Sequence, residues 1–212
     1  KYLANKNSSV AGIIGCGVQA ITQIMALKEV LPSIQEVKAY DINNQAALQL
    51  KEKIEKEFSL STQVVEKAQD AVEESDVIVT VTVADEPIVK EKWLKKGSFF
   101  AHVGSYQEEE EDVIIHSDKI VVDVWTEVLH RGTPLVAKLY NQGKIGDTNI
   151  YANIGEIING RKVGRENPKE RIFFSPMGLG SEDVAVAWRV YQQAREKSLG
   201  QKLSLWDRPI FA

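Results

Sequence analysis

A glycine-rich turn near the start of the chain constrains the fold more than any other feature of the sequence. The turn Gly15-Cys16-Gly17-Val18-Gln19-Ala20 follows a short apolar run, Val10–Ile14, and precedes apolar residues with helical spacing over Val18–Leu31. The apolar run predicts a buried strand, and the spacing predicts a helix. A glycine turn between a strand and a helix is typical of a βαβ unit that binds a dinucleotide.

Apolar runs alternate with amphipathic segments along the rest of the chain. We expect further strands over Glu36–Tyr40, Thr62–Val65, Val77–Val81, Ser98–Val103, Lys119–Val124 and Arg171–Ser175. We expect further helices over Ala46–Phe58, Gln69–Glu74, part of Glu109–Ser117, Thr126–Asn141 with an interruption at Arg131-Gly132, Ile154–Asn159 and Glu182–Lys197, and a helical turn at Glu91–Lys96. Because the strands are apolar throughout, they indicate a mostly parallel sheet with helices on both faces. The predicted fold class is therefore α/β, a doubly wound Rossmann sheet.

Each position of the glycine turn has a physical reason in such a site. Gly15 permits the tight turn, and Gly17 lets the backbone approach a pyrophosphate. Ala20 replaces a third glycine and is small enough for close packing of helix on strand. The first N–H groups of the helix, at Val18, Gln19 and Ala20, would face the phosphates. The alternative is a turn that only packs a helix against a strand.

Asp41 supplies the second half of the signal. It ends the second predicted strand, about twenty positions after the turn, where an acid accepts hydrogen bonds from ribose hydroxyls and repels a 2′-phosphate. Residues 42–45 contain no Arg or Lys that would neutralise such a phosphate. The sequence therefore favours NAD(H) over NADP(H) as the cofactor. The alternative is that Asp41 is solvated in a loop.

Composition excludes several other classes of protein. The net charge of -4 gives no basic field that would recruit nucleic acid. No apolar stretch reaches the ~20 residues that a membrane span needs. The single cysteine, Cys16, cannot form a disulfide framework and fits a reducing compartment, so we expect a cytoplasmic protein without a signal peptide. Cys16 could be a reactive thiol near a helix N-terminus, but a small residue that fits the turn is the favoured interpretation.

No other catalytic apparatus competes with a cofactor. The sequence contains no His, Cys, Asp and Glu grouping with metal-ligand spacing and no serine nucleophile elbow. We therefore expect the cofactor to perform the redox chemistry and the protein to position it.

Sequence landmarks continue well past the glycine turn. They are Gly12–Ala20, Thr80–Thr82, Glu86-Pro87, Trp93, Gly97, His102–Ser105, Lys119–Asp123, Gly155–Ile157, Met177–Leu179 and Glu182–Ala185. Together they resemble the ornithine cyclodeaminase / mu-crystallin family over almost the whole chain. The resemblance implies hydride transfer between NAD(P) and the carbon that bears nitrogen in an amino acid, or its imine, as in ornithine cyclodeaminase, alanine dehydrogenase and ketimine reductase.

The resemblance also implies two domains. Residues 1–176 would form the NAD(P)-binding Rossmann domain, and residues 177–212 would be a helical tail of a substrate and dimerisation domain. The family's N-terminal region, whose Arg and Lys hold the substrate carboxylate, would precede Lys1, and we expect it to be absent from this chain. We expect a homodimer when full length, an amino acid, amine or imine as substrate, and an inactive protein for these 212 residues alone.

The catalytic residue stays open. The resemblance places a catalytic aspartate two residues after the glycine that matches Gly104, but Tyr106 stands there, and a tyrosine hydroxyl with a reference pKa near 10 is a poor base. Glu109 matches a nearby family glutamate, although we favour a solvated helix start for the run Glu108–Asp112. Both ornithine and alanine are therefore in doubt as substrates. The alternative function is a non-catalytic dinucleotide-binding protein, or an accessory subunit of an amine- or amino-acid-oxidising system.

Strand ends supply the remaining cofactor candidates. Open α/β sheets bind ligands at the carboxyl ends of their strands. By position we expect cofactor contacts from Thr80, Val81 and Thr82, and by resemblance also from Val103, Gly104 and Ser105 beside the nicotinamide. Each of these residues could instead serve strand-end packing.

Three histidines remain. His102 ends the fifth predicted strand and is either a ligand-binding residue or a packed one. His130-Arg131 could bind an acidic group of a substrate or cap a helix, and we expect His116 at the surface.

Overall fold

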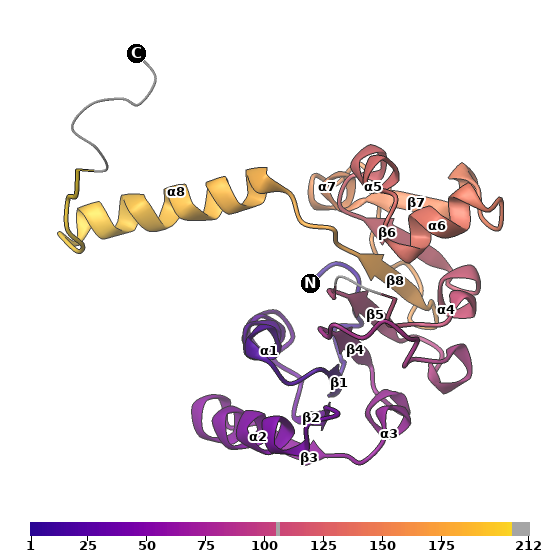
Figure 1. Ribbon diagram of the computed structural model, residues 1–212, viewed down its shortest axis with the longest axis horizontal. Coiled ribbons are helices and arrows are strands. Elements are labelled where there is room, and N and C mark those ends of the chain that lie inside the picture. Colours follow the sequence, from indigo (N-terminus) through magenta and orange to yellow (C-terminus); the bar gives the residue numbers. More distant parts are fainter. Residues whose placement is uncertain (105–106, 205–212) are drawn as a thin grey trace. The chain divides into compact units, whose positions relative to one another are not determined.

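The computed structural model describes residues 1–104 and 107–204 of the chain, which divides into two compact units. The first unit comprises Lys1–Met177 and the second Gly178–Ala212. The first unit contains an eight-stranded sheet in the order β3-β2-β1-β4-β5-β8-β6-β7, in which every pair of neighbours is parallel (Figure 1). Its strands are β1 (Val10–Ile14), β2 (Glu36–Tyr40), β3 (Ser61–Val64), β4 (Val77–Thr80), β5 (Phe99–His102), β6 (Lys119–Val122), β7 (Ile150–Asn153) and β8 (Ile172–Ser175).

Helices connect these strands. They are α1 (Val18–Val30), α2 (Asn44–Phe58), α3 (Ala68–Val72), α4 (Glu111–Ile115), α5 (Trp125–Arg131), α6 (Leu135–Asn141) and α7 (Ile154–Ile158), with short 3-10 helices η1 (Glu91–Trp93) and η2 (Asp147–Asn149). The predicted doubly wound α/β sheet is thus confirmed.

Successive residues of a strand point to opposite faces of the sheet, and each face is covered, so every strand can bury side chains on both sides. Ile13 belongs to a core cluster that contains residues of α1 and α2, whereas its neighbour Ile14 belongs to a separate cluster that contains residues of α3, α4, α5 and α6. Figure 1 shows α1 and α2 on one side of the sheet and α3 and α4 on the other. The continuous apolar strands of the sequence are explained by these two cores.

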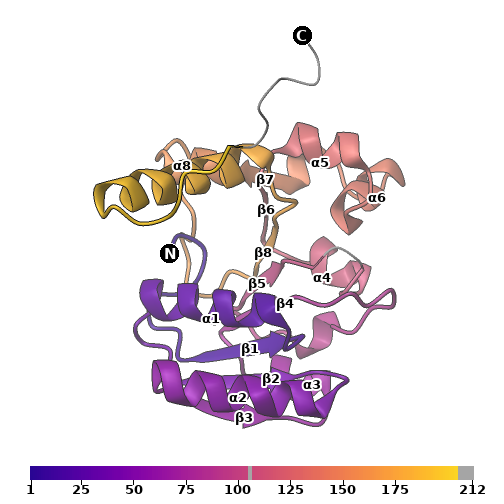
Figure 2. The same ribbon diagram turned by 60° about the vertical axis from the view of Figure 1, so that its left-hand side comes forward.

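The strand order reverses between β1 and β4. From β1 the chain moves outward through β2 to β3, with α1 beside β1 and α2 beside β2 and β3, and then returns to place β4 on the other side of β1 (Figure 2). A reversal of this kind leaves a crevice outside the carboxyl ends of the strands, where open α/β sheets bind their ligands.

One strand was not predicted, and one predicted helix is divided. The edge strand β7 was not expected, because only Ala152 among its four residues is fully buried and the apolar pattern is weak. The expected helix over Thr126–Asn141 is two helices, since Gly132 adopts a left-handed φ of 67° and Pro134 precedes α6. The interruption expected at Arg131-Gly132 is therefore confirmed.

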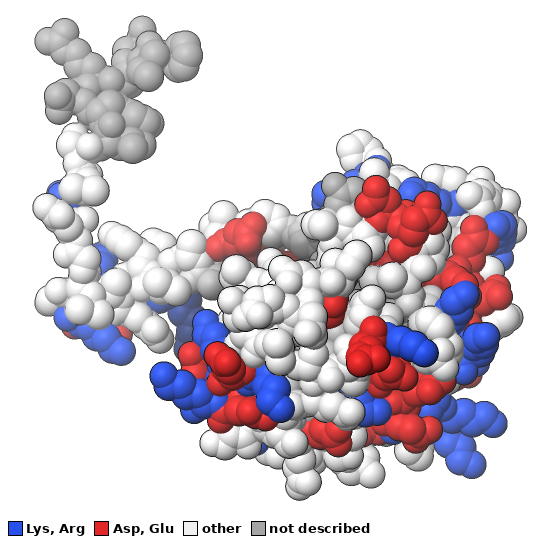
Figure 3. All heavy atoms as spheres, turned by 60° about the horizontal axis from the view of Figure 1, so that its bottom comes forward, with Lys and Arg blue, Asp and Glu red and all other residues white. Residues whose placement is uncertain are grey.

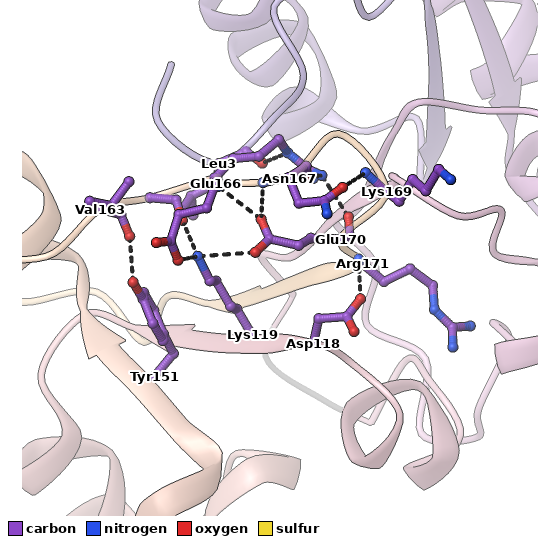
Figure 4. Close-up of polar contacts among 12 residues, drawn as sticks. Leu3, Asp118, Lys119, Tyr151, Val163, Glu166, Asn167, Lys169, Glu170 and Arg171 are labelled. Atoms are coloured by element: carbon purple, nitrogen blue, oxygen red, sulfur yellow. Dashed lines mark hydrogen bonds and ion pairs between the residues drawn. The ribbon is translucent and has the colours of Figure 1, made fainter.

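A polar network closes the opposite, amino-terminal edge of the sheet (Figure 4). Lys119, the first residue of β6, donates to the Gly164 carbonyl (2.7 Å), Glu166 (2.6 Å) and Glu170 (3.2 Å), and its ammonium lies 4.3 Å from the centre of the Tyr151 ring. Burial lowers the pKa of Lys119, but the bonds to both glutamates outweigh burial and raise it. All three ammonium donors are used, so this network is structural.

The second unit contains one described helix, α8 (Gly180–Glu196), which begins with Glu182 and Asp183 in its first turn. The rings of Trp188 and Tyr191 lie 5.5 Å apart on it. None of the described helices is long and apolar enough to cross a membrane. On the face shown in Figure 3, basic side chains lie among acidic ones rather than in a field of one sign.

Candidate dinucleotide-binding site

The glycine turn lies at the carboxyl end of β1, where only glycine fits its first position. Gly15 has a left-handed φ of 93°, and a Cβ there would lie 2.7 Å from the Val81 carbonyl oxygen. The Gly15 N–H donates to the Tyr40 carbonyl at 2.9 Å, which ties the turn to the end of β2. The tight turn that the sequence predicts is therefore packed between the ends of β2 and β4.

Gly17 has a different reason to be glycine. Its φ of -77° suits any residue, and a Cβ there would meet no atom within 4 Å. The side of Gly17 that a side chain would occupy is open space, so its lack of a side chain leaves room for a ligand at the start of α1.

The next residues begin α1. Ala20 is fully buried, and its N–H donates to the Gly17 carbonyl at 3.1 Å. It therefore packs the helix on the sheet, while Val18 and Gln19 are exposed at the helix N-terminus. Of the three N–H groups predicted to face phosphates, those of Val18 and Gln19 lie at the open end of the helix.

Asp41 holds the turn as well as facing the cavity. One carboxylate oxygen accepts from the Cys16 N–H at 2.7 Å, and the other accepts from the Asn43 N–H at 2.8 Å. The alternative of a merely solvated Asp41 is therefore wrong. Each oxygen still has a second lone pair that can accept from a hydroxyl.

Cys16 is a packed residue rather than a reactive thiol. Burial, reinforced by the charge of Asp41, raises the pKa of the Cys16 thiol to about 12. Since the thiolate is the reactive form, this environment suppresses nucleophilic chemistry. The favoured interpretation of Cys16 agrees with its surroundings.

A cavity of about 470 Å³ lies at the reversal of strand order. Its walls contain Ile14, Gly15, Gly17, Tyr40, Asp41, Ile42, Val81, Thr82, Val83, Ala84 and Ile88. Five of the predicted cofactor residues thus meet in one place. A second cavity, also about 470 Å³, shares Tyr40, Asp41 and Ile42 with it and continues toward Leu48 and Val65.

Other predicted residues lie outside this cavity. Thr80 is fully buried beneath it, and its hydroxyl has no hydrogen-bond partner among the described residues. Val103 and Gly104 line a smaller cavity of about 60 Å³ with His102, Arg131, Thr133 and Met177. Ser105 and Tyr106 lie outside the residues that the structure describes, so the predictions made for them stay predictions.

The acidic run departs most from the sequence prediction. Glu108 and Glu109 are fully buried, and α4 begins only at Glu111. The favoured interpretation of a solvated helix start is therefore wrong for these two residues. The reason is long-range pairing, because Glu109 forms a parallel bridge with Val89 and so turns inward.

Glu109 forms a short contact with the histidine at the end of β5. Its carboxylate lies 2.5 Å from His102 Nδ1, while His102 Nε2 lies 3.1 Å from the Gly104 carbonyl oxygen. Burial raises the pKa of Glu109 more than its contact with His102 lowers it. Burial lowers the pKa of His102, but Glu109 outweighs burial and raises it. The pair therefore retains a proton, and His102 is a packed histidine.

Glu108 is a residue that sequence reasoning missed. One of its carboxylate oxygens lies 2.5 Å from both the backbone nitrogen and the hydroxyl of Thr82. Its backbone carbonyl accepts from the N–H groups of Ile88 and Val89. No local pattern marks it, since its partners come from a distant part of the chain.

The other two histidines lie at the surface and are not part of the cavity. His116 and His130 are both exposed, as expected for the first of them. Arg131 donates weakly to the Met177 carbonyl at 3.5 Å. Among the described residues, no three His, Cys, Asp or Glu side chains are placed to hold a metal ion together.

Comparison with known proteins matches this architecture to one family. A model of the ornithine cyclodeaminase/mu-crystallin family matches residues 1–198. An alanine dehydrogenase of Archaeoglobus fulgidus is 41% identical over 210 residues, which cover 97% of this chain and 63% of that protein.

Solved structures agree with this match. The Thermococcus litoralis Delta(1)-pyrroline-2-carboxylate reductase in complex with NADH and L-proline is 37% identical, with a TM-score of 0.89 over 95% of this chain and 63% of that one. An archaeal alanine dehydrogenase dimer with bound NAD is 38% identical, with a TM-score of 0.86 over 97% of this chain and 63% of that one. The chain thus spans somewhat less than two thirds of the length of these relatives, and it belongs to the ornithine cyclodeaminase/mu-crystallin family.

Proposed function

We propose that this chain is the dinucleotide-binding part of an NAD(H)-dependent oxidoreductase that transfers hydride at the nitrogen-bearing carbon of an amino acid or its imine. The observation that carries the proposal is the cavity at the reversal of strand order, where Gly15, Gly17 and Asp41 converge. Its fit to a dinucleotide rests on the open space at Gly17 and on the lone pairs that Asp41 retains. The relatives that were solved with NAD or NADH support the same assignment.

The proposed cofactor contacts follow the cavity from β2 to β5. Asp41 accepts from the adenosine ribose, and the start of α1 faces the pyrophosphate. The full proposed set is Gly15, Gly17, Val18, Gln19, Ala20, Asp41, Thr80, Val81, Thr82, Val103, Gly104 and Ser105, with Ala20 and Thr80 acting through packing. When bound, the nicotinamide supplies the redox chemistry. The residues of this chain hold and orient it.

We further propose that residues 177–212 belong to a substrate and dimerisation domain. The apolar residues Val184, Trp188 and Tyr191 recur on α8 at the spacing of one helix face, and the helix buries none of its own residues. The archaeal alanine dehydrogenase was solved as a dimer, which supports a homodimer for the protein that carries this chain.

Cofactor preference provides a direct test. We expect the chain to bind NAD⁺ at least about tenfold more tightly than NADP⁺, because the Asp41 carboxylate repels a 2′-phosphate. Isothermal titration calorimetry measures both dissociation constants. Ile42 is 96% exposed and lines the cavity, so Ile42→Arg is a matched variant that should narrow the preference by supplying a cation. Equal or tighter binding of NADP⁺ by the parent chain would contradict the assignment.

The reaction class is tested with the complete gene product that carries this chain. We expect NAD⁺-linked oxidation of at least one amino acid, or NADH-linked reduction of a cyclic imine, followed by absorbance at 340 nm. A panel of amino acids, amines and cyclic imines covers the substrates of the relatives. Tight NAD binding without turnover on the whole panel would favour the alternative, a dinucleotide-binding protein or accessory subunit.

A further inference from the structure

A buried carboxylate stands directly behind the wall of the proposed cofactor cavity. Glu108 is fully buried, and one of its oxygens lies 2.5 Å from the nitrogen and from the hydroxyl oxygen of Thr82, which lines the cavity. The Glu108 backbone also accepts from Ile88, another lining residue. This side chain therefore supports one wall of the cavity from inside the protein.

The hydrogen bonds of Glu108 show that its carboxylate acts as an acceptor. The Thr82 hydroxyl accepts from the Ala84 N–H at 3.1 Å, so its own proton is available to Glu108. Two donors therefore converge on one oxygen of Glu108, which is the arrangement of a carboxylate acceptor. The second oxygen is buried without a hydrogen-bond partner among the described residues, and it lies 3.6 Å from His102 Nε2.

The neighbouring histidine does not cancel this charge. His102 Nε2 lies 3.1 Å from the Gly104 carbonyl oxygen, which can only accept, so this nitrogen carries a proton, and it lies 3.6 Å from the second oxygen of Glu108. The short contact between His102 Nδ1 and Glu109 requires one more proton, on either partner. Both arrangements leave the His102–Glu109 pair with no net charge. The cluster of His102, Glu108 and Glu109 therefore keeps the one negative charge that the Glu108 carboxylate contributes.

The negative charge lies close to where the nicotinamide half of a bound dinucleotide would extend. A dinucleotide with its ribose at Asp41 and its pyrophosphate at Gly17 extends its other half across the ends of β4 and β5. Thr82 follows β4 and Gly104 follows β5, and Glu108 packs against both, since a Cβ on Gly104 would lie 2.3 Å from its carboxylate. The charge thus lies on the nicotinamide side. Arg131 lines the adjoining small cavity but is exposed, so water screens it.

We propose that Glu108 holds a fixed negative charge behind the nicotinamide end of the cavity and thereby favours the oxidised, cationic form of the dinucleotide over the reduced form. The proposal rests on the proposed function, because it needs a dinucleotide in this cavity. Glu108 is a specificity-determining residue that acts through Thr82 and through its charge, without touching substrate. One unit charge acting across roughly 12 Å at an effective dielectric constant of about 20 changes an equilibrium about tenfold.

The test compares the NAD⁺ and NADH affinities of two variants of the 212-residue chain. Glu108→Gln removes the charge but keeps an oxygen that can accept from Thr82. Glu110→Gln is the matched control, because Glu110 lies in the same acidic run but forms a half-exposed ion pair with Lys90. We expect the ratio of the NAD⁺ to the NADH dissociation constant to rise about fivefold to tenfold in E108Q and to stay within about twofold in E110Q.

ADP-ribose, which lacks the nicotinamide, separates the possible failures. We expect E108Q and the parent to bind it equally. An unchanged NAD⁺-to-NADH ratio in an E108Q variant that still binds ADP-ribose would overturn this inference alone. A parent chain that binds none of the three ligands would overturn the proposed function instead. If E108Q does not fold, the NAD⁺ and NADH dissociation constants of the parent chain are compared instead. Tighter binding of NAD⁺ supports the inference, and tighter binding of NADH contradicts it.

Discussion

Replacing Gly17 with valine should weaken NAD binding by about a hundredfold or more while leaving the protein folded. The side chain would extend into the open space beside the start of α1, because a Cβ at Gly17 meets no protein atom within 4 Å. A ligand that needs that space would be excluded, and a hundredfold loss corresponds to about 2.7 kcal/mol of binding free energy. The φ of -77° at Gly17 is compatible with valine.

Stability provides the control for this variant. Gly17 is the N-cap of α1 without a side-chain hydrogen bond, so its replacement should lower the free energy of unfolding by only about 1 kcal/mol or less. Gly146→Val is a matched substitution, since Gly146 also precedes a helix, also faces open space and has a φ of -127°, but lies outside the cavity. NAD titration and urea denaturation of both variants check the prediction. Binding by G17V within about fivefold of the parent would show that the pyrophosphate does not lie at this turn.

The parts of the site that the sequence predicted are those with local signals. Gly15 and Gly17 are set by a strand, a turn and a helix that are adjacent in the chain, and Asp41 follows from the end of the next strand. These three residues meet in the cavity as expected. The strand pattern likewise predicted a parallel sheet, because each strand is buried on both faces.

The parts that were not predicted depend on distant partners. Glu108 and Glu109 stand in a charged run that is typical of a solvated helix start, but contacts with distant residues, among them Thr82, Val89 and His102, hold them inside the protein. The order of the strands in the sheet also depends on distant partners. β8 follows β7 in the chain but lies between β5 and β6, and no local pattern encodes this insertion.

Replacing Gly12 with alanine should destabilise the fold by about 3 kcal/mol or more, the upper range for overpacking in a core. Gly12 lies in the middle of β1, where α3 crosses the strand closely. A Cβ there would lie 2.0 Å from the Ala71 carbonyl oxygen, which belongs to the backbone of α3. The whole helix would have to move away from the sheet, and its buried residues Ala71 and Val72 would lose their packing.

Urea denaturation and thermal melting measure this loss. For a chain of this size, 3 kcal/mol corresponds to a decrease of roughly 6 to 12 °C in the melting temperature. Gly155→Ala is the matched control, because Gly155 lies in α7 with open space around it, and alanine is the better helix former. A loss below about 1 kcal/mol in G12A would show that α3 can shift without cost.

A second substitution identifies the atom responsible. The Ser75 hydroxyl would lie 3.0 Å from the new Cβ, and it donates to the same Ala71 carbonyl at 2.7 Å. If the side chain of Ser75 caused the clash, Ser75→Ala would restore stability to G12A. Because the closest contact is with backbone, we expect the double variant to be no more stable than G12A, and less stable if the Ser75 hydrogen bond contributes its usual ~1 kcal/mol. Gly12 is thus fixed by the approach of a helix to a strand, whereas Gly17 is fixed by the space that a ligand needs.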